Sequence, residues 1–322
     1  MKTDAAASNL RISKPNKDEF SKLWKQYQPF IIKDVATHWD ACNKWSNNYL
    51  KEHCGDNILP IQGRDKDFLE NYKNFASSEG FYNIKEMRFS EYIDYIEDKV
   101  NGKENNYDLE FYLSEGLFEE RFPEIIEDVT YPAYINRKPL IQFWYGCSNK
   151  NYTATSPLHF DGMHNIFVQI RGRKKILLFP PSNYLSFYPP IEDSMGYLHH
   201  SKVLPHLLDL ELFPKFPWQE RIEVILLPGE ILYIPAYWWH HVTAVDENIS
   251  LSFFYDFKIP DLFIQKNFLS TYINVSSHYF YRAISSKESL LNRLNRIKSM
   301  LFSQSLTERL RQKNSNGFYN EK

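Results

Sequence analysis

The sequence predicts a mainly β protein with flanking helices, either an all-β barrel or a double-sheet jelly roll. The first observation is a series of short apolar runs between residues 109 and 257, separated by glycine, proline and other turn residues. Runs at this density are typical of barrels and jelly rolls. The second observation is that 16% of the residues are aromatic, since tyrosine and phenylalanine favour strands and broad cavity walls. The length of 322 residues allows one large domain with appendages.

The first hundred residues mix predicted helices and strands, and we treat residues 1–106 as an N-terminal α/β portion that packs on the barrel. Four residues there recur at helical spacing: Phe20, Leu23, Trp24 and Tyr27. The apolar run at residues 29–35 is typical of a buried strand. A second helix is predicted by four residues that share one helix face: Phe89, Tyr92, Ile93 and Ile96. Residues 107–259 then form the predicted β core.

Residues 260–322 are predicted to be a helical C-terminal extension. Ser285 and Glu288 match a capping box. A stripe of apolar residues follows: Leu290, Leu291, Leu294, Ile297 and Leu301. The stripe can dock on the barrel or on a second copy of the chain. Basic residues outnumber acidic ones between Lys287 and Lys313, which indicates a solvated helix face; an arm that binds nucleic acid is the less favoured alternative.

The composition disfavours several classes of protein. A net charge of −2 gives no overall field that would attract nucleic acid or an anionic membrane. No run of about 18 apolar residues and no signal-peptide pattern occurs, so no membrane span is expected. Three scattered cysteines are too few for a disulfide framework and fit a reducing compartment. We therefore expect a cytoplasmic protein, or a nuclear one if the organism is eukaryotic.

The segment TSPLHFDGMHN carries a histidine and an aspartate two positions apart, His159 and Asp161. The Ser-Pro before them favours an extended chain, which would project both side chains from one face. A surface polar pair is the alternative, because His-x-Asp is a common pattern. His240 lies 79 residues after Asp161, which excludes a local helical zinc motif. Two histidines and one carboxylate form the facial set that holds non-haem Fe(II), although catalytic zinc can use the same ligands.

Two further features bear on this candidate site. His240 and His241 are adjacent, so on a strand only one of them can face the metal, and periodicity does not decide which. Lys174 begins an apolar run after a turn at Gly172, and it can point either into the barrel or to the surface as part of a basic turn. Beside an iron set, an inward lysine is what a dicarboxylate co-substrate needs, together with hydroxyl donors. The hydroxyl candidates are Ser156 and Tyr112.

These motifs together resemble the Jumonji-C, cupin-like family of Fe(II)- and 2-oxoglutarate-dependent oxygenases, in particular its small protein-hydroxylase branch. The resemblance rests on the stretches SPLHFDGMHNIFVQIRGRKKILLFPP, LPGEILYIPAYWWHHV and ISLSFFYDF, and it covers roughly residues 107–257. It implies a double-stranded β-helix, which is a jelly roll with helices packed outside. The sequence departs from the family at Ser252, where some members have asparagine, and at Phe254, where tryptophan is frequent. These departures bear on the substrate rather than on iron binding.

The resemblance also implies roles for individual residues. The iron ligands it implies are His159, Asp161 and His240, which leaves His241 as a structural histidine. The groups that would hold the distal carboxylate of 2-oxoglutarate are Lys174, Ser156 and Tyr112, and Asn165 falls near the co-substrate. Four other histidines are expected on loops or at the surface: His164, His199, His200 and His206.

The activity that the resemblance implies is hydroxylation of a protein side chain by Fe(II) and O2, in which 2-oxoglutarate becomes succinate and CO2. Hydroxylation of a small molecule or of a tRNA base is an alternative that the same fold performs. Lysine demethylation is less favoured, because the chain has no room for an added chromatin-reading module. A cupin-like binding protein without turnover is the remaining alternative. Relatives often dimerise through C-terminal helices, so a homodimer is expected.

Overall fold

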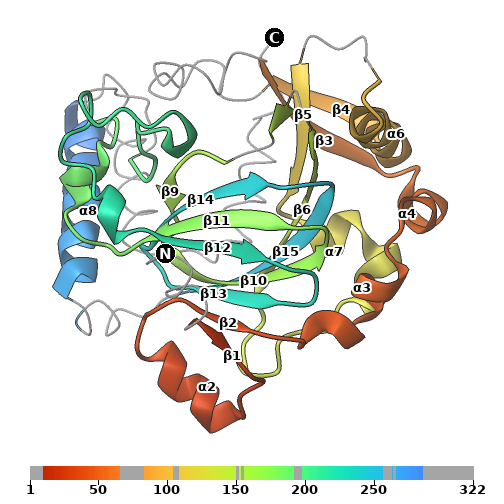
Figure 1. Ribbon diagram of the computed structural model, residues 1–322, viewed down its shortest axis with the longest axis horizontal. Helices are drawn as coiled ribbons and strands as arrows, with labels where there is room; N and C mark the ends of the chain where they lie inside the picture. The colour runs from red at the N-terminus through yellow and green to blue at the C-terminus, as the bar shows by residue number, and fades with distance from the viewer. Residues whose placement is uncertain are drawn as a thin grey trace.

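Two β-sheets form the centre of the molecule (Figure 1). The computed structural model describes residues 10–65, 83–103, 109–149, 152–153, 156–191, 198–256, 263 and 266–285. The larger sheet has the strand order β1-β2-β13-β10-β15-β6-β5-β3-β4, and the smaller sheet has the order β12-β11-β14-β9. The strands of the described residues are β1 (Arg11–Ile12), β2 (Phe30–Ile32), β3 (Ile58–Asp65), β4 (Asn83–Arg88), β5 (Leu109–Glu115), β6 (Leu140–Gly146), β7 (Ser148–Asn149), β8 (Tyr152–Thr153), β9 (His159–Phe160), β10 (Met163–Arg171), β11 (Lys174–Phe179), β12 (Ile222–Leu226), β13 (Ile231–Ile234), β14 (Trp239–Ala244) and β15 (Asn248–Asp256).

The strands from β9 to β15 form a jelly roll, because the chain passes repeatedly between the two sheets. Strands β9, β11, β12 and β14 belong to the smaller sheet, whereas β10, β13 and β15 belong to the larger one. Every pairing among these strands is antiparallel. The predicted double-stranded β-helix with flanking helices is therefore confirmed.

The turn between β10 and β11 depends on Gly172, whose φ of +64° lies in the left-handed region. A Cβ atom at this position would lie 1.9 Å from the backbone oxygen of Glu247, so a side chain cannot fit there without a shift of the backbone. The turn leads the chain from the larger sheet directly into β11. It thereby places Lys174 at the first position of β11, one of the two inner strands of the smaller sheet.

Two helices of the N-terminal portion, α2 and α6, form where the apolar spacing predicts them, although α2 ends at Trp24 and Tyr27 lies beyond it with a φ of 52°. Helix α2 begins after Asn16, whose side chain accepts hydrogen bonds from the backbone of Asp18 and Glu19, and Glu19 bonds back to Asn16. This capping box satisfies amide groups that a helix start otherwise leaves unpaired. The α-helices of the described residues are α2 (Lys17–Trp24), α3 (Asp40–Lys44), α4 (Asn47–Cys54), α6 (Phe89–Val100), α7 (Phe118–Arg121) and α8 (Lys266–Ser285).

Short 3₁₀ turns complete the connections. They are η1 (Ala36–His38), η3 (Pro123–Asp128), η4 (Tyr184–Phe187), η5 (Pro205–Leu207) and η6 (Trp218–Glu220). Strands β1 to β4 of the N-terminal portion continue the larger sheet at its two edges, so this portion shares a sheet with the jelly roll. The division into parts at residues 106/107 and 259/260 stays a prediction.

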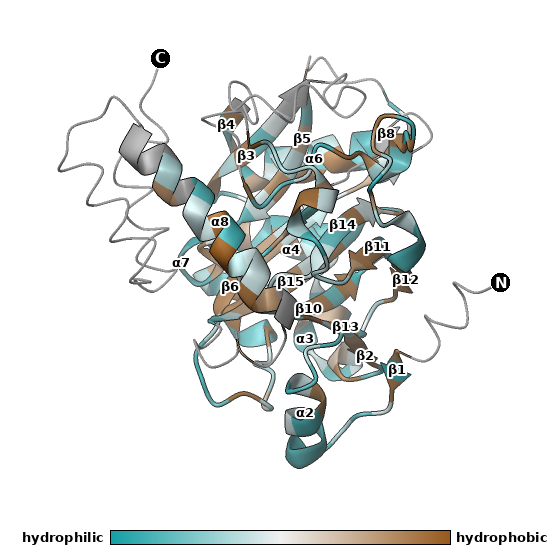
Figure 2. Cartoon of the chain, turned by 90° about the vertical axis from the view of Figure 1, so that its left-hand side faces the viewer, coloured by the Kyte–Doolittle hydropathy of each residue, from teal (hydrophilic) through white to brown (hydrophobic). Residues whose placement is uncertain are grey.

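The larger sheet separates an apolar core from the cavity side because residues alternate along its strands. On β15, Ile249, Leu251 and Phe253 belong to the hydrophobic cluster that includes residues of α3, α4 and α6. Ser250 and Ser252 lie on the opposite face, which a strand's two-residue period requires. In Figure 2 strands β6, β11 and β12 are mainly brown, whereas α2 is mainly teal. The inner face of β15 therefore presents polar residues toward the cavity, whereas its outer face packs in the apolar core.

Helix α8 lies beside the jelly roll, at the left in Figure 1. Phe268 of α8 is buried against Tyr27 and Tyr237, with ring centroids 5.3 and 6.0 Å away. The helix predicted from the capping box at Ser285 lies outside the described residues beyond its first residue. Among the helices that the structure describes, none has both the length and the apolar character needed to cross a membrane.

Candidate metal centre

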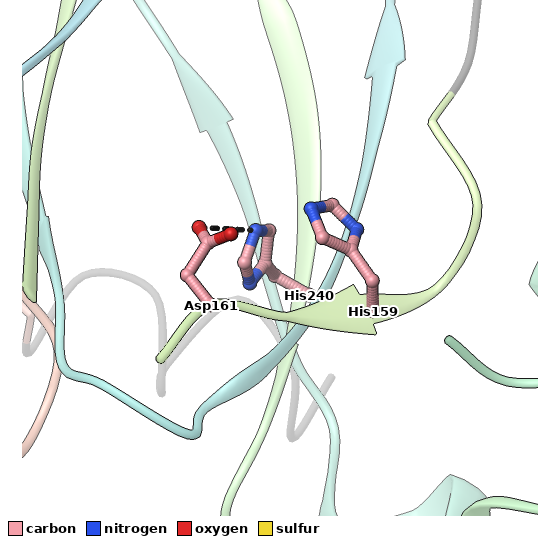
Figure 3. A group of neighbouring side chains, drawn as sticks. All are labelled: His159, Asp161 and His240. Atoms are coloured by element: carbon pink, nitrogen blue, oxygen red, sulfur yellow. Dashed lines mark ion pairs between the residues drawn. The ribbon is translucent and has the colours of Figure 1, made fainter. Parts of the chain in front are cut away.

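Three side chains on or directly after two paired strands of the smaller sheet converge (Figure 3). His159 lies in β9 and pairs directly with His240 of β14, and Asp161 follows β9. The rings of His159 and His240 have centroids 4.2 Å apart, and Nε2 of His240 lies 3.5 Å from Oδ2 of Asp161. One ligand atom from each of the three residues lies within 4.8 Å of the other two. The antiparallel register therefore brings together residues that are 79 positions apart in the chain.

Both histidines are oriented by backbone carbonyl groups. Nδ1 of His159 lies 2.8 Å from the oxygen of Pro157, and Nδ1 of His240 lies 3.0 Å from the oxygen of Trp238. A carbonyl can only accept, so each Nδ1 carries the proton and each Nε2 keeps a lone pair. Burial, with a smaller contribution from His159, lowers the pKa of His240 to about 4, so this imidazole is neutral near pH 7. Two Nε2 lone pairs and a carboxylate suit a divalent metal ion.

His241 points away from this group. Its Nδ1 donates to the backbone oxygen of Ser156 at 2.7 Å, and its ring stacks on His206 with centroids 5.7 Å apart. His240, Val242 and Ala244 face one cavity, as a strand's period requires, and His241 lies on the other face of β14. The geometry therefore favours His240 over its neighbour as the third ligand. The carbonyl of Ser156 is the neighbour that holds His241.

Lys174 lies at the other end of the same cavity. Its amine donates to Oγ of Ser250 at 2.6 Å and to the hydroxyl of Tyr112 at 3.2 Å, and only 1% of the residue is exposed. Burial lowers the pKa of this amine to about 7. Among the residues that the structure describes, no carboxylate forms an ion pair with Lys174. A buried lysine is costly without a counter-charge. An anionic ligand in the cavity could provide that counter-charge by pairing with the amine of Lys174.

Tyr112 reaches Lys174 because Gly146 on the neighbouring strand has no side chain. A Cβ atom on Gly146 would lie 2.3 Å from Cε2 of Tyr112, well inside van der Waals contact. The rings of Phe167, Trp144 and Tyr112 surround the amine, with centroids 5.1, 5.8 and 5.9 Å from Nζ. Aromatic faces attract a cation and exclude water from it. The ring faces offset only part of the cost of burial, which still lowers the pKa of the amine, and they provide no anion.

Asn165 and Ser252 lie between the two ends of the cavity. Oγ of Ser252 accepts hydrogen bonds from Nδ2 of Asn165 at 3.2 Å and from Nε1 of Trp144 at 3.0 Å. The amide oxygen of Asn165 is buried and has no hydrogen-bond partner among the described residues. Buried polar atoms are nearly always paired. A ligand in the cavity would complete this group, with either orientation of the amide.

All seven residues proposed from the sequence line a single cavity of about 250 Å³. Ser156 lies in its wall, where its hydroxyl accepts from the backbone amide of Val242 at 3.0 Å. Ser250 is a further polar residue that was not predicted, although the alternation of Ser250 and Ser252 with apolar residues in ISLSFFYDF indicates two polar groups on one face. His200, from the long insert between β11 and β12, also lines the cavity.

One expectation about the other histidines is wrong. His164 is 1% exposed and lies within β10, where its ring packs against Trp24 with centroids 4.6 Å apart. Its Nδ1 accepts from the backbone amide of Ala236 at 3.3 Å and lies 3.0 Å from the hydroxyl of Tyr233. His164 is therefore buried among aromatic residues that include Trp24 of the N-terminal portion, and it does not lie at the surface. It is not part of the metal-ligand group.

Comparison with known proteins identifies the fold family. A family model described as the cupin-like domain matches residues 16–260. The chain belongs to the cupin-like domain family. The match begins at Asn16 and so includes most of the N-terminal portion as well as the jelly roll. The Jumonji-C resemblance inferred from the sequence is confirmed, because proteins similar to this chain carry Jumonji-C names.

Three similar proteins show how much of each sequence is shared. The Drosophila melanogaster protein named Jumonji C domain-containing protein 5 is 28% identical over 258 residues, which cover 76% of this chain and 59% of the relative. Lysine-specific demethylase 8 of Xenopus tropicalis is 30% identical over 71% of this chain and 48% of its own length. The mouse protein named 2-oxoglutarate and iron-dependent oxygenase JMJD4 is 28% identical, with coverages of 70% and 54%. The cupin-like chain thus spans about half to three-fifths of these relatives.

Proposed function

We propose that this protein is an Fe(II)- and 2-oxoglutarate-dependent oxygenase that hydroxylates a side chain of another protein. The observation that carries the proposal is the pairing of two incomplete groups in one cavity. A set of two histidines and one carboxylate lies at one end, and a buried lysine without a carboxylate partner among the described residues lies at the other. A metal ion and a dicarboxylate would complete both. The name of the mouse relative, which specifies iron and 2-oxoglutarate, agrees with this assignment.

The residues that would hold the metal are His159, Asp161 and His240. Their donor types fit Fe(II), because two neutral imidazoles and one carboxylate bind it and leave further positions for other ligands. Bound Fe(II) would supply the oxidation chemistry, in which O2 and 2-oxoglutarate yield succinate and CO2 while one oxygen atom enters a C–H bond of the substrate. The backbone oxygens of Pro157 and Trp238 fix the two rings so that Nε2 faces the site.

Lys174 would bind the distal carboxylate of 2-oxoglutarate through a charge-assisted hydrogen bond. Tyr112 and Ser250 hold the amine in place, because each already accepts one of its three protons and the third remains for the ligand. Asn165 would donate its amide to the co-substrate once the side chain is turned to present nitrogen to the cavity. Ser156 lines the wall of the same space. The surrounding aromatic rings would keep water from the bound carboxylate.

The proposal is tested by incubating the purified protein with Fe(II), ascorbate and 2-oxoglutarate and measuring succinate, with and without candidate peptides. We expect succinate from the wild type and none from Asp161→Ala. A gain of one oxygen atom in a peptide supports protein hydroxylation, whereas release of formaldehyde from methylated lysine peptides would instead support demethylation. Stimulation by small molecules or tRNA alone would favour those substrates. Iron binding without any succinate would support a non-catalytic binding protein.

A further inference from the structure

A second cavity adjoins the cavity that contains His159, Asp161 and His240, which we call the metal cavity. It has a volume of about 370 Å³ and lies between α7 and the ends of β6, β10 and β15. Phe254 lines both cavities. Met163, two residues after Asp161, lines the second one. We call this space the outer cavity.

The two cavities lie along one continuous face of the sheet. Across the strands, Phe254 of β15 pairs with Asn165 of β10 on one side and with Leu140 of β6 on the other. Along each strand, residues two apart share a face. Ser252 and Phe254 therefore lie on one face of β15, and Asn165 and Met163 lie on one face of β10. The face that carries the polar residues of the metal cavity continues into the apolar floor of the outer cavity.

The outer cavity has an apolar floor and a charged rim. The rim has three carboxylates, from Glu119, Glu120 and Asp256, and two cations, from Arg137 and Lys138. Both cations have partners: Lys138 lies 2.9 Å from Glu119, and Arg137 donates to the backbone oxygen of Asp256 at 3.2 Å. The exposed carboxylate of Asp256 makes no hydrogen bond or ion pair with any residue that the structure describes. This balance disfavours a phosphate backbone and favours a basic group.

We propose that the outer cavity binds the polypeptide segment next to the oxidised residue of a protein substrate. One apolar side chain of that segment lies on Leu140, Met163 and Phe254, and a neighbouring lysine or arginine pairs with Asp256. This inference rests on the proposed function and deepens it, because it specifies the sequence around the target. A free small molecule would need only the metal cavity, whereas a polypeptide must continue beyond it. The mixture of apolar floor and charged rim is typical of surfaces that recognise peptides.

The test uses pools of synthetic peptides in which one flanking position is fixed and the others are degenerate. Oxidation is read as a mass increase of one oxygen atom. For the wild type we expect faster oxidation of pools with a large apolar residue at one position and lysine or arginine at another. Leu140→Arg should lower these rates at least tenfold, and Asp256→Lys should exchange the basic preference for an acidic one. Leu227→Arg is the matched control, since Leu227 is 43% exposed and lines neither cavity.

Separate measurements distinguish failure of this inference from failure of the proposed function. Iron content, 2-oxoglutarate affinity and succinate release without peptide should be unchanged in Leu140→Arg and Asp256→Lys. Unaltered flanking preferences in these variants, or 2-oxoglutarate turnover stimulated only by non-peptide substrates, would overturn the inference. If the wild type releases no succinate, the proposed function fails. The inference about the outer cavity is then tested by measuring binding of the same peptide pools to immobilised protein. Apolar-basic pools retained by the wild type but not by Leu140→Arg would support it, and equal retention would contradict it.

Discussion

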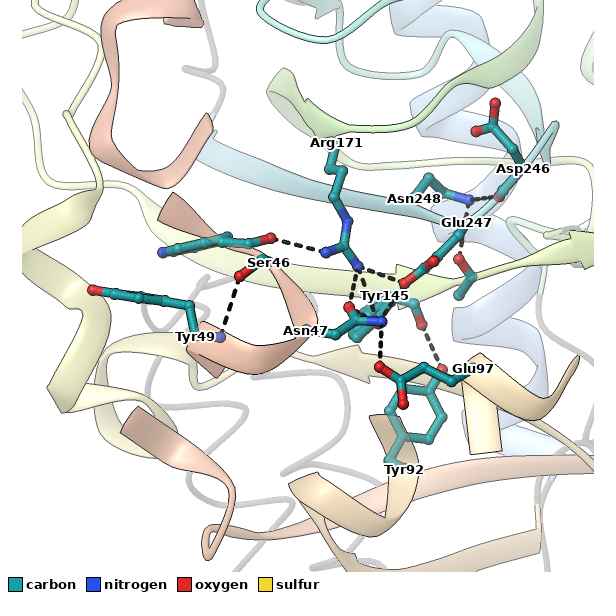
Figure 4. Close-up of polar contacts among 12 residues, drawn as sticks. Ser46, Asn47, Tyr49, Tyr92, Glu97, Tyr145, Arg171, Asp246, Glu247 and Asn248 are labelled. Carbon is teal, nitrogen blue, oxygen red and sulfur yellow. Dashed lines mark hydrogen bonds and ion pairs between the residues drawn. The ribbon is translucent and has the colours of Figure 1, made fainter. Parts of the chain in front are cut away.

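Two cations at the same end of the jelly roll, Arg171 and Lys174, have opposite surroundings. Arg171 ends β10 and lies in a network of polar groups (Figure 4). Its guanidinium donates to Glu247 at 2.6 Å, to Asn47 at 2.6 Å and to the backbone oxygen of Trp45 at 2.9 Å. Lys174, three residues later, is more deeply buried and has hydroxyl groups and aromatic rings around it, with no carboxylate among the described residues.

The difference indicates that Arg171 has a structural role, whereas Lys174 is available to bind an anionic ligand. The network around Arg171 joins β10 to α4 and to the turn before β15, and its charges are paired within the protein. Another buried lysine, Lys99, has the same kind of complete environment, with Glu110 at 2.6 Å. Buried charges in proteins are normally paired in this way. The exception at Lys174 lies in the cavity that also holds the unpaired amide oxygen of Asn165, which identifies the space where a polar ligand belongs.

The largest expected effect comes from removing the charged metal ligand. Asp161→Ala should abolish succinate formation and reduce bound iron to background, because two imidazoles alone bind Fe(II) weakly. The fold should persist, since Asp161 lies outside the strands. Iron content, succinate and a thermal melt should be measured together. Normal turnover in the variant would mean that another group supplies the carboxylate.

The next prediction compares the two cations directly by replacing each with methionine. Lys174→Met should weaken 2-oxoglutarate binding roughly ten- to a hundred-fold, as a charge-assisted hydrogen bond of about 1.5–3 kcal/mol is lost. It should leave the free energy of unfolding within about 1 kcal/mol of the wild type, because no buried anion is left behind.

Arg171→Met should do the reverse. It should lower the free energy of unfolding by about 1.5–3 kcal/mol, because Glu247 and Asn47 lose a charged donor. Its affinity for 2-oxoglutarate should stay near that of the wild type once the protein is folded. Denaturant melts and calorimetric titration on the metal-loaded protein measure both quantities. Equal losses of stability in the two variants would remove the distinction between the two regions.

A smaller effect is expected from pH. Burial lowers the pKa of the Lys174 amine to about 7, and a bound carboxylate favours its protonated form. Above pH 7, binding must therefore take up a proton, so 2-oxoglutarate affinity should fall as pH rises, by at most about tenfold per pH unit. Titrations between pH 6.5 and 8.5 on wild type and Lys174→Met provide the comparison. The slope should be absent from Lys174→Met, and an equal slope in both proteins would assign it to another group.

The smallest effect concerns the hydroxyl that positions the lysine. Tyr112→Phe removes one hydrogen bond of about 0.5–1.5 kcal/mol, so 2-oxoglutarate affinity should fall roughly two- to tenfold. Iron content should not change. Gly146→Ala is the companion variant, because its Cβ would displace the Tyr112 ring and should produce a similar loss. A larger loss in Tyr112→Phe than in Lys174→Met would reverse the assigned roles.

The sequence was sufficient to predict the elements whose signals are local. The spacing of apolar residues predicted α2 and α6, and the density of short apolar runs predicted the jelly roll. The His-x-Asp motif brought two of the three clustered residues together, since Asp161 directly follows the strand that holds His159. Such features depend on residues that are near one another in the chain.

Features that depend on long-range register could not be predicted from periodicity. The inward face of β14 is decided by the pairing of His240 with His159, and both faces of that strand are buried. Ser250 contacts Lys174 across 76 positions, and no local pattern specifies that contact. The expectation of a loop or surface position fails for His164 because Tyr233 and Ala236 provide it with polar partners inside, and no local pattern specifies them.

The central claim is that the metal is held on the face of β14 that carries His240. The most direct measurement is the iron content of two purified variants, His240→Ala and His241→Ala, loaded under identical anaerobic conditions. We predict that His240→Ala loses iron and activity, whereas His241→Ala retains iron and loses only some stability through the missing hydrogen bond to Ser156. Retention of iron by His240→Ala together with its loss from His241→Ala would contradict the assignment of this face.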